Sequence, residues 1–167
     1  MTAPPEQGRG VWVSWVRERF HDGEREELSQ EVPGRIYWQG ESVGYLFYRE
    51  GAEMDGQQTC LKLQHRQITL IRQGQFRLRQ VFRAGATTLG TYHTPYGSYP
   101  LTCQTLECSW TLAEWLQVRL TYLLRLADEE QGRFVWQIRA DGRSLAGEGL
   151  SATDGDWAGD APRPIRG

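Results

Sequence analysis

The chain has 167 residues and a mass of 19.2 kDa, a size typical of one domain with its own hydrophobic core. Its formal net charge of −2 provides no overall positive field to attract nucleic acid or an acidic membrane surface. Three cysteines are too few for a disulfide framework, and no apolar run approaches the roughly 18 residues of a membrane span. The first ten residues also lack the build of a signal peptide, so we expect a soluble, cytoplasmic, single-domain protein.

The basic side chains are almost all arginine, because Lys62 is the single lysine among 19 basic residues. Genomic base composition explains this bias most simply. Arginine also presents a planar fork that suits carboxylate or phosphate, so selection for an anionic ligand is the second interpretation. The bias alone does not decide between the two.

Composition divides the chain into three regions. Residues 1–10 contain two prolines and two glycines without periodicity and are predicted to form a flexible arm. Residues 141–167 are dense in glycine and proline and poor in apolar side chains, which predicts a disordered or loosely attached tail from which Trp157 could dock back. Residues 11–140 are the predicted folded domain.

Alternation of apolar and polar residues predicts strands throughout the central region. In residues 116–126 the apolar side chains fit a period of two without a miss, which favours a strand over a helix despite the leucines. Residues 24–31 are polar and leave helix or edge strand open, and Pro33-Gly34 is expected to break this segment from the next. The other expected strands are 11–20, 35–38, 42–50, 59–64, 67–72, 76–82, 87–94, 98–110, 115–126 and 134–139. This spacing, with no convincing helix, predicts an antiparallel sandwich or barrel.

A series of motifs between Tyr45 and Gly97 carries a resemblance to a known family. They are Tyr45-x-x-Tyr48-x-Glu50, Thr59-x-Leu61-Lys62-Leu63, Ile68-Thr69-Leu70-Ile71-Arg72-Gln73-Gly74, Phe82-x-x-Gly85 and Tyr92-His93-Thr94-Pro95-Tyr96-Gly97. In order and spacing they resemble the bacterial YwiB-like family, a family of unknown function. The resemblance runs from about Val11 to Arg139. It implies a calycin-like closed antiparallel β-barrel of about 8–10 strands, the architecture of lipocalins, and a cytoplasmic setting, but no reaction and no catalytic residues.

Five polar side chains stand at strand ends beside turns and are the candidate ligand-binding residues: Tyr48, Glu50, Arg72, Tyr92 and Tyr96. At a barrel mouth a carboxylate, a guanidinium and phenolic hydroxyls could converge on a small polar ligand. The alternative is an internal Glu–Arg pair with tyrosines packed around it. The strand register at Gly74 bears on this choice. A two-residue loop pairs Ile71 with the face of Phe76, Leu78 and Phe82, whereas a three-residue loop pairs Leu70 with Leu78 and Arg72 with Phe76.

The function expected from these observations is a non-enzymatic barrel that binds a small ligand, or a protein partner, through its mouth. This hypothesis predicts a mixed apolar and polar cavity near Glu50 or Arg72. The alternative is an enzyme of unknown reaction that uses Glu50 or His93 as general base. The sequence leaves the ligand and the oligomeric state open.

Other candidate sites are weaker. Arg77, Arg79 and Arg83, with Lys62 and Arg66 nearby, could bind single-stranded nucleic acid, but a solvated outer face of a sheet is the favoured interpretation. The histidines at positions 21, 65 and 93 and the cysteines at 60, 103 and 108 show no metal-site spacing, and phosphate-loop, dinucleotide and nucleophile-elbow motifs are absent from the sequence. We therefore expect no metal and no cofactor.

Overall fold

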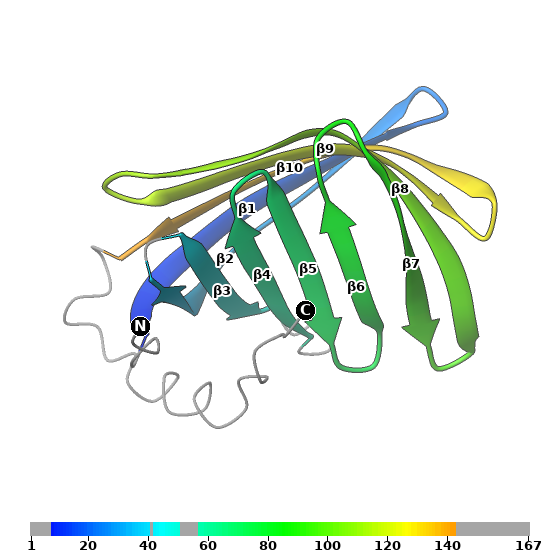
Figure 1. The fold of residues 1–167 in the computed structure, drawn as a ribbon. Helices are drawn as coiled ribbons and strands as arrows, with labels where there is room; N and C mark the ends of the chain where they lie inside the picture. The colour runs from blue at the N-terminus through cyan, green and yellow to red at the C-terminus, as the bar shows by residue number, and fades with distance from the viewer. Residues whose placement is uncertain (1–7, 41, 51–56, 143–167) are drawn as a thin grey trace.

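Ten antiparallel strands close into a single barrel in the computed structural model, which describes residues 8–40, 42–50 and 57–142 (Figure 1). Each strand pairs with its neighbours in sequence, and β1 pairs with β10 to close the sheet. The strands are β1 Arg9–His21, β2 Glu24–Gln39, β3 Val43–Arg49, β4 Gln58–Gln64, β5 Gln67–Gln73, β6 Arg77–Phe82, β7 Thr87–Thr94, β8 Gly97–Leu112, β9 Leu116–Leu126 and β10 Glu129–Asp141. The predicted all-β closed barrel is therefore confirmed.

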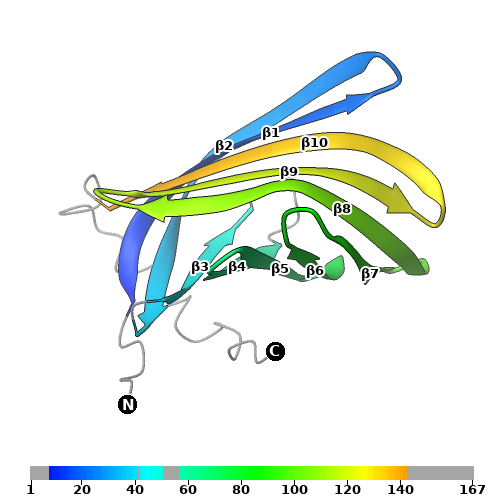
Figure 2. The same cartoon turned by 45° about the horizontal axis from the view of Figure 1, so that its top comes forward.

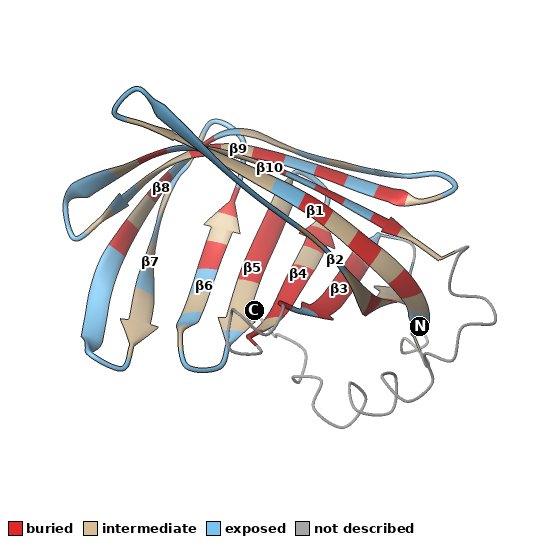
Figure 3. Ribbon diagram, turned by 180° about the vertical axis from the view of Figure 1, so that it is seen from behind, coloured by how far each residue is buried: buried red, intermediate tan, exposed pale blue. Residues whose placement is uncertain are grey.

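Strand length divides the barrel into two sides. The strands β3 to β7 have 6 to 8 residues each and form one side, whereas β1, β2, β8, β9 and β10 have 11 to 16 and arch over it (Figure 2). The long strands extend past the barrel as hairpins whose tips are largely exposed (Figure 3). The Asp22-Gly23 turn joins β1 to β2 with positive φ at both residues, as a two-residue hairpin loop requires.

The strand β2 continues through Pro33-Gly34, where the sequence was expected to break it. Pro33 pairs with Trp12, and Gly34 lies so close to β3 that a Cβ there would be 2.5 Å from the Phe47 carbonyl oxygen. Glycine at this point allows the close approach, and the single proline removes only one ladder donor. The undecided segment 24–31 is the first half of the same strand, paired with β1.

The connection from β5 to β6 differs from both registers that the sequence suggested. Leu70 pairs with Gln80 and Arg72 with Leu78, which lengthens the loop around Gly74 by two residues relative to the three-residue alternative. Gln57 stabilises this wider loop, because its side-chain oxygen accepts a hydrogen bond from the Phe76 backbone N–H at 2.8 Å. Arg72 consequently lies on the same face as Leu70, toward the barrel interior.

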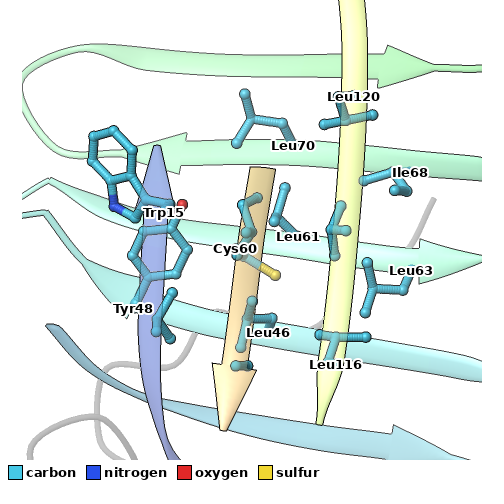
Figure 4. Close-up of a cluster of buried hydrophobic side chains, with 14 of the residues drawn as sticks. Trp15, Leu46, Tyr48, Cys60, Leu61, Leu63, Ile68, Leu70, Leu116 and Leu120 are labelled. Atoms are coloured by element: carbon cyan, nitrogen blue, oxygen red, sulfur yellow. The ribbon is translucent and has the colours of Figure 1, made fainter. Parts of the chain in front are cut away.

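One end of the barrel interior is packed with apolar side chains. Fully buried residues from both sides meet there, among them Leu46, Leu61, Leu63, Ile68, Leu116 and Leu120 (Figure 4). The Trp15 and Trp136 rings meet edge to face above this layer, with centroids 6.4 Å apart. The opposite end of the interior is not filled in this way, and the candidate site lies there.

The arm and the tail predicted from composition lie almost entirely outside the described residues. The first strand begins at Arg9, two residues earlier than expected, and the last ends at Asp141. Among the described residues no helix is long and apolar enough to cross a membrane.

Candidate functional site

A cavity of about 340 Å³ occupies the second end of the barrel interior. Its walls are mainly apolar side chains from six strands: Leu28, Leu70, Leu78, Phe82, Leu101, Tyr122, Leu124, Leu126 and Phe134. Polar side chains enter it from six strands: Arg17, Arg19, Glu26, Arg72, Gln80, Tyr92 and Gln131. A volume near the lower end of known ligand sites, with few polar groups among apolar walls, is typical of a small-molecule pocket.

Arg72 lines the cavity and is held from behind by Glu50. Its Nη2 lies 3.0 Å from Glu50 Oε2, an ion pair whose angle is not that of a directed hydrogen bond. The hydroxyl of Thr59, which pairs with Arg72 across the sheet, donates to the same carboxylate oxygen at 2.9 Å. Glu50 is only 3 % exposed, so this carboxylate is a buried counter-ion and does not reach the rim.

Arg19 stands at the open end of the cavity with its hydrogen-bonding capacity engaged. Its Nε donates to the backbone oxygen of Gln131 at 2.7 Å, and its Nη1 lies 3.4 Å from Glu26. The Gln131 carbonyl is available because β10 has a bulge between Glu130 and Gly132. Gly132 has a φ of 111°, and a Cβ there would be 2.5 Å from the Phe20 oxygen, so the bulge requires glycine.

Arg17 enters the cavity between these two arginines and has no carboxylate partner among the described side chains. Its guanidinium lies over two indole rings, 5.0 Å from the Trp15 centroid and 5.2 Å from that of Trp136. Burial, followed by the nearby Arg72 cation, lowers the pKa of Arg17 from its ordinary value. The surroundings of Arg17 thus disfavour its charge more than they stabilise it.

Buried hydrogen-bond donors accumulate beside this pair of cations. Tyr48 Oη, Trp15 Nε1, Trp136 Nε1 and Arg72 Nε have no hydrogen-bond partner within the described part of the chain. Burial, and then the Glu50 charge, raises the pKa of Tyr48, and burial raises that of Tyr122 to about 12, so both phenols keep their protons at neutral pH. The cluster is therefore rich in donors and has a single carboxylate.

Gln80 is the principal polar group on the opposite wall. It is 1 % exposed, and its Nε2 donates to Thr88 Oγ1 at 2.8 Å and to the Val81 oxygen at 3.0 Å. The β6–β7 ladder pairs only three residues of each strand. The side-chain hydrogen bond from Gln80 to Thr88 joins the two strands beyond the end of that ladder. Gln80 Oε1 remains without a partner among the residues described and lies against Gly90 of β7, where a Cβ would be 3.3 Å from it.

The structure brings together three of the five predicted ligand-binding residues. Tyr48, Glu50 and Arg72 form one buried cluster, deeper than the rim position that was expected. Tyr92 lines the cavity and stacks on Phe76 with centroids 6.0 Å apart. Tyr96 lies in the β7–β8 turn, is 87 % exposed, and does not share the site with the other four.

His93 and the three arginines of the alternative hypotheses lie outside this interior, unlike Glu50. His93 pairs with Arg77 on the outer face, and its Nδ1 is 2.8 Å from Ser98 Oγ, so it does not meet Glu50. Arg77, Arg79 and Arg83 are exposed on or beside β6, and Arg83 donates to Gln67 at 2.7 Å. Within the described ranges no three His, Cys, Asp or Glu side chains group as a metal site would require.

Sequence reasoning missed Arg17 and Gln80 as cavity residues. The signal for Arg17 was present, because Val11, Val13, Trp15 and Arg17 alternate along one face of β1, and the first three belong to the core. An arginine that continues an inward-facing apolar row is a candidate interior cation. The same signal was present for Gln80, which alternates with Leu78 and Phe82 along one face of β6.

A larger, open groove of about 690 Å³ lies on the outer surface across β2, β1, β10, β9 and β8. Outward-facing side chains such as Ser14, Glu31, Gln117, Arg119 and Arg139 line much of it. Exposed polar side chains on a sheet surface are solvated individually, and Arg119 already pairs with Glu107 at 3.2 Å. The interior cavity is the better candidate because it is enclosed by strands from both sides of the barrel and because Arg72 and its counter-ion Glu50 are largely buried.

A ten-stranded antiparallel barrel with a partly charged interior cavity defines the structural class of this protein. Comparison with known proteins then places the chain. It belongs to the family described as a domain of unknown function, DUF1934, whose model matches residues 13–138. The resemblance to the YwiB-like family is thereby confirmed.

Two comparisons lead to the same relative in Bacillus subtilis. The chain is 25 % identical over 111 residues to the uncharacterized beta-barrel protein YwiB of strain 168, covering 66 % of this chain and 78 % of that protein. The crystal structure of that ywiB protein superposes with a TM-score of 0.74 at 20 % identity and covers 83 % of this chain and 94 % of the other. This likeness establishes a common fold.

Proposed function

We propose that this protein is a non-enzymatic barrel that binds one small molecule in its interior cavity. The observation that carries the proposal is the division of the interior: one end is packed, and the other keeps about 340 Å³ between apolar walls with charged side chains at its floor. Well-packed interiors leave few voids larger than a water molecule, whereas this volume corresponds to about ten waters. A purely structural barrel has no need of such a space.

The site residues support binding rather than a defined reaction. Glu50, the one carboxylate in the buried cluster, is neutralised by Arg72 and accepts a hydrogen bond from Thr59, which suits a structural counter-ion. The cavity therefore presents cations, donors and apolar surface, the elements of recognition.

Native mass spectrometry of the purified protein after incubation with a metabolite extract tests the proposal. We expect a reproducible retained mass in the unmodified protein and its loss in Leu124→Trp, which places an indole in the cavity. Leu112→Trp is the matched control, because Leu112 is 53 % exposed near the tip of the β8–β9 hairpin. A bare chain under all conditions, or retention that is unaffected by Leu124→Trp, would contradict binding in the cavity.

A further inference from the structure

We propose that the ligand is a small carboxylic acid with an apolar body, bound as its monoanion with the carboxylate on Arg17 at the cavity floor. This inference rests on the proposed function and specifies its ligand class. It follows from four features of the site: the balance of charge, the access to one guanidinium from the cavity, the surplus of buried donors, and the nature of the walls.

The charges around the cavity do not balance. Three arginines line it, at positions 17, 19 and 72, against the carboxylates of Glu26 in the lining and Glu50 behind Arg72. Glu26 lies against Arg19, and Glu50 lies against Arg72. One positive charge is left over, on Arg17. A single carboxylate would neutralise it, whereas a phosphate monoester carries close to two negative charges at neutral pH.

Arg17 can receive an anion from the cavity. Its guanidinium lies close to the Trp15 and Trp136 rings and is not enclosed on all sides, because the side chain also lines the cavity. The planar fork matches a carboxylate in a bidentate arrangement, and in a partly buried site this contact is stronger than at the surface. Arg72 lies close enough to depress the pKa of Arg17, so an anion placed here would interact favourably with both cations.

The buried polar atoms next to Arg17 also lack acceptors. Trp136 Nε1, Trp15 Nε1 and Tyr48 Oη are donors without partners in the part of the chain that the structure describes, and their residues are at most 2 % exposed. Buried donors in proteins are normally hydrogen-bonded to protein, water or ligand. None of these three residues lines the cavity, so a carboxylate on Arg17 would lie beside this donor cluster without contacting it directly. A cationic head group would add further donors and a further positive charge to this end of the cavity.

The remaining walls are suited to an apolar body. From the arginines toward the open end the cavity is lined by Leu78, Leu101, Leu124, Leu126 and Phe134. Burial of a hydrocarbon chain against these side chains stabilises the complex by about 0.8 kcal/mol for each methylene group. The ligand is therefore an amphipathic acid whose head group is buried first.

Isothermal titration calorimetry with three ten-carbon probes tests this inference: decanoate, 1-decanol and decylammonium. The probes share one apolar chain and differ in the charge of the head group. We expect decanoate to bind at least tenfold more tightly than decanol and decylammonium not to bind measurably. Arg17→Gln should weaken decanoate binding by about tenfold to hundredfold and leave decanol unchanged, as expected when one charge-assisted contact is lost. Arg77→Gln, which removes an exposed arginine from the outer face of β6, should change neither.

The outcomes separate the inference from the proposed function. Equal affinities for decanoate and decanol, or an Arg17→Gln variant that binds decanoate normally, would overturn the carboxylate inference while the cavity still binds a ligand. Failure of all three probes, together with a bare chain from the metabolite extract, would overturn the proposed function itself. Circular dichroism spectra that coincide with those of the unmodified protein show that each variant is folded.

Discussion

Arg17 and Arg72 share one cavity but differ in what neutralises them. Arg72 has a buried carboxylate at 3.0 Å, and Arg17 has two aromatic faces. A buried ion pair contributes little net stability as a pair, yet removal of one partner leaves the other charge uncompensated. The two arginines should therefore respond in opposite ways to substitution, and the response tests their roles.

Glu50→Gln should lower the free energy of unfolding by about 3–5 kcal/mol, because it leaves the Arg72 cation buried without its counter-ion. Urea denaturation measures this change. The control is Glu107→Gln, which breaks the exposed pair with Arg119 and should cost less than about 1 kcal/mol. The double substitution Glu50→Gln with Arg72→Met should recover much of the loss. Equal effects of Glu50→Gln and Glu107→Gln would mean that the Glu50 pair is not buried in solution.

Arg17→Met should leave the free energy of unfolding unchanged or raise it by up to about 1 kcal/mol. The pKa of Arg17 is lowered in the folded protein, so the folded state holds this cation less favourably than the unfolded chain does. Methionine keeps an unbranched apolar contact with the tryptophans and removes the charge. Thermal unfolding without ligand measures the effect. A fall of several degrees in Tm would instead identify Arg17 as a structural residue.

At the residue scale, the sequence predicted some residues of the site and missed others. Glu50 and Arg72 were predicted as partners, and the alternative of an internal Glu–Arg pair describes what they form. The depth of Glu50 and Arg72 depends on which face each residue occupies, and alternation does not determine this when a strand is apolar on both faces, as β3 is between Tyr45 and Tyr48. Arg17 and Gln80 were predictable, because each lies in an alternating row whose apolar members face the interior.

Among the elements, the bulge in β10 has the most specific effect on the site, because it turns the Gln131 carbonyl toward Arg19. Bulges of this kind place one extra residue in a strand and bend it locally. The bulge depends on Gly132, whose positive φ and contact with the Phe20 oxygen exclude a side chain.

Gly132→Ala should lower the free energy of unfolding by about 2–3 kcal/mol, since both the backbone conformation and the contact with Phe20 become strained. Gly23→Ala is the matched control: its φ is also positive, at 76°, but no atom lies within 4 Å of the position of a Cβ. Urea denaturation of both variants separates the contact from the conformational cost. If Gly132→Ala lowers the free energy of unfolding no more than Gly23→Ala does, the close contact with the Phe20 oxygen does not make glycine necessary in β10.

Strand positions followed from the sequence more closely than strand connections did. The period of two located β9 and the Asp-Gly turn located the first hairpin, because both signals are local. The predicted break in β2 at Pro33-Gly34 was wrong, and the two loop lengths that the sequence allowed at Gly74 were both shorter than the observed loop. The observed course of each segment is determined by contact with another strand or side chain, Phe47 in the first case and Gln57 in the second.

At the scale of the whole molecule, burial removes ionisable side chains from water, as it does apolar ones, and this changes their pKa values. Burial raises the pKa of Cys60 to about 12 and the pKa values of Cys103 and Cys108 to about 11 each. In the unfolded chain a thiol ionises near pH 8.5. The unfolded state therefore loses these protons first as the pH rises, and ionisation favours unfolding.

The thiol contribution to the free energy of unfolding should be constant below about pH 8.5 and should then fall by up to about 1.4 kcal/mol per pH unit for each of the three thiols. Urea denaturation at several pH values between about 7.5 and 10 measures the slope, in the range below the ordinary pKa of tyrosine. Cys103→Ala should remove about a third of this slope. A slope that is unchanged in Cys103→Ala would show that this thiol is accessible to water in the folded protein.

The pairing of β1 with β10 closes the barrel and determines when the cavity forms during folding. The first and last strands are joined by pairs such as Trp12 with Asp141, which are far apart in sequence and slow to form during folding. The Arg17 guanidinium lies over Trp136 of β10 only after this seam has formed. Under the proposed function, a ligand held there would not guide the chain toward its fold. It would act later, by retarding the reopening of the seam, and would prolong the lifetime of the folded barrel without shortening the time needed to reach it.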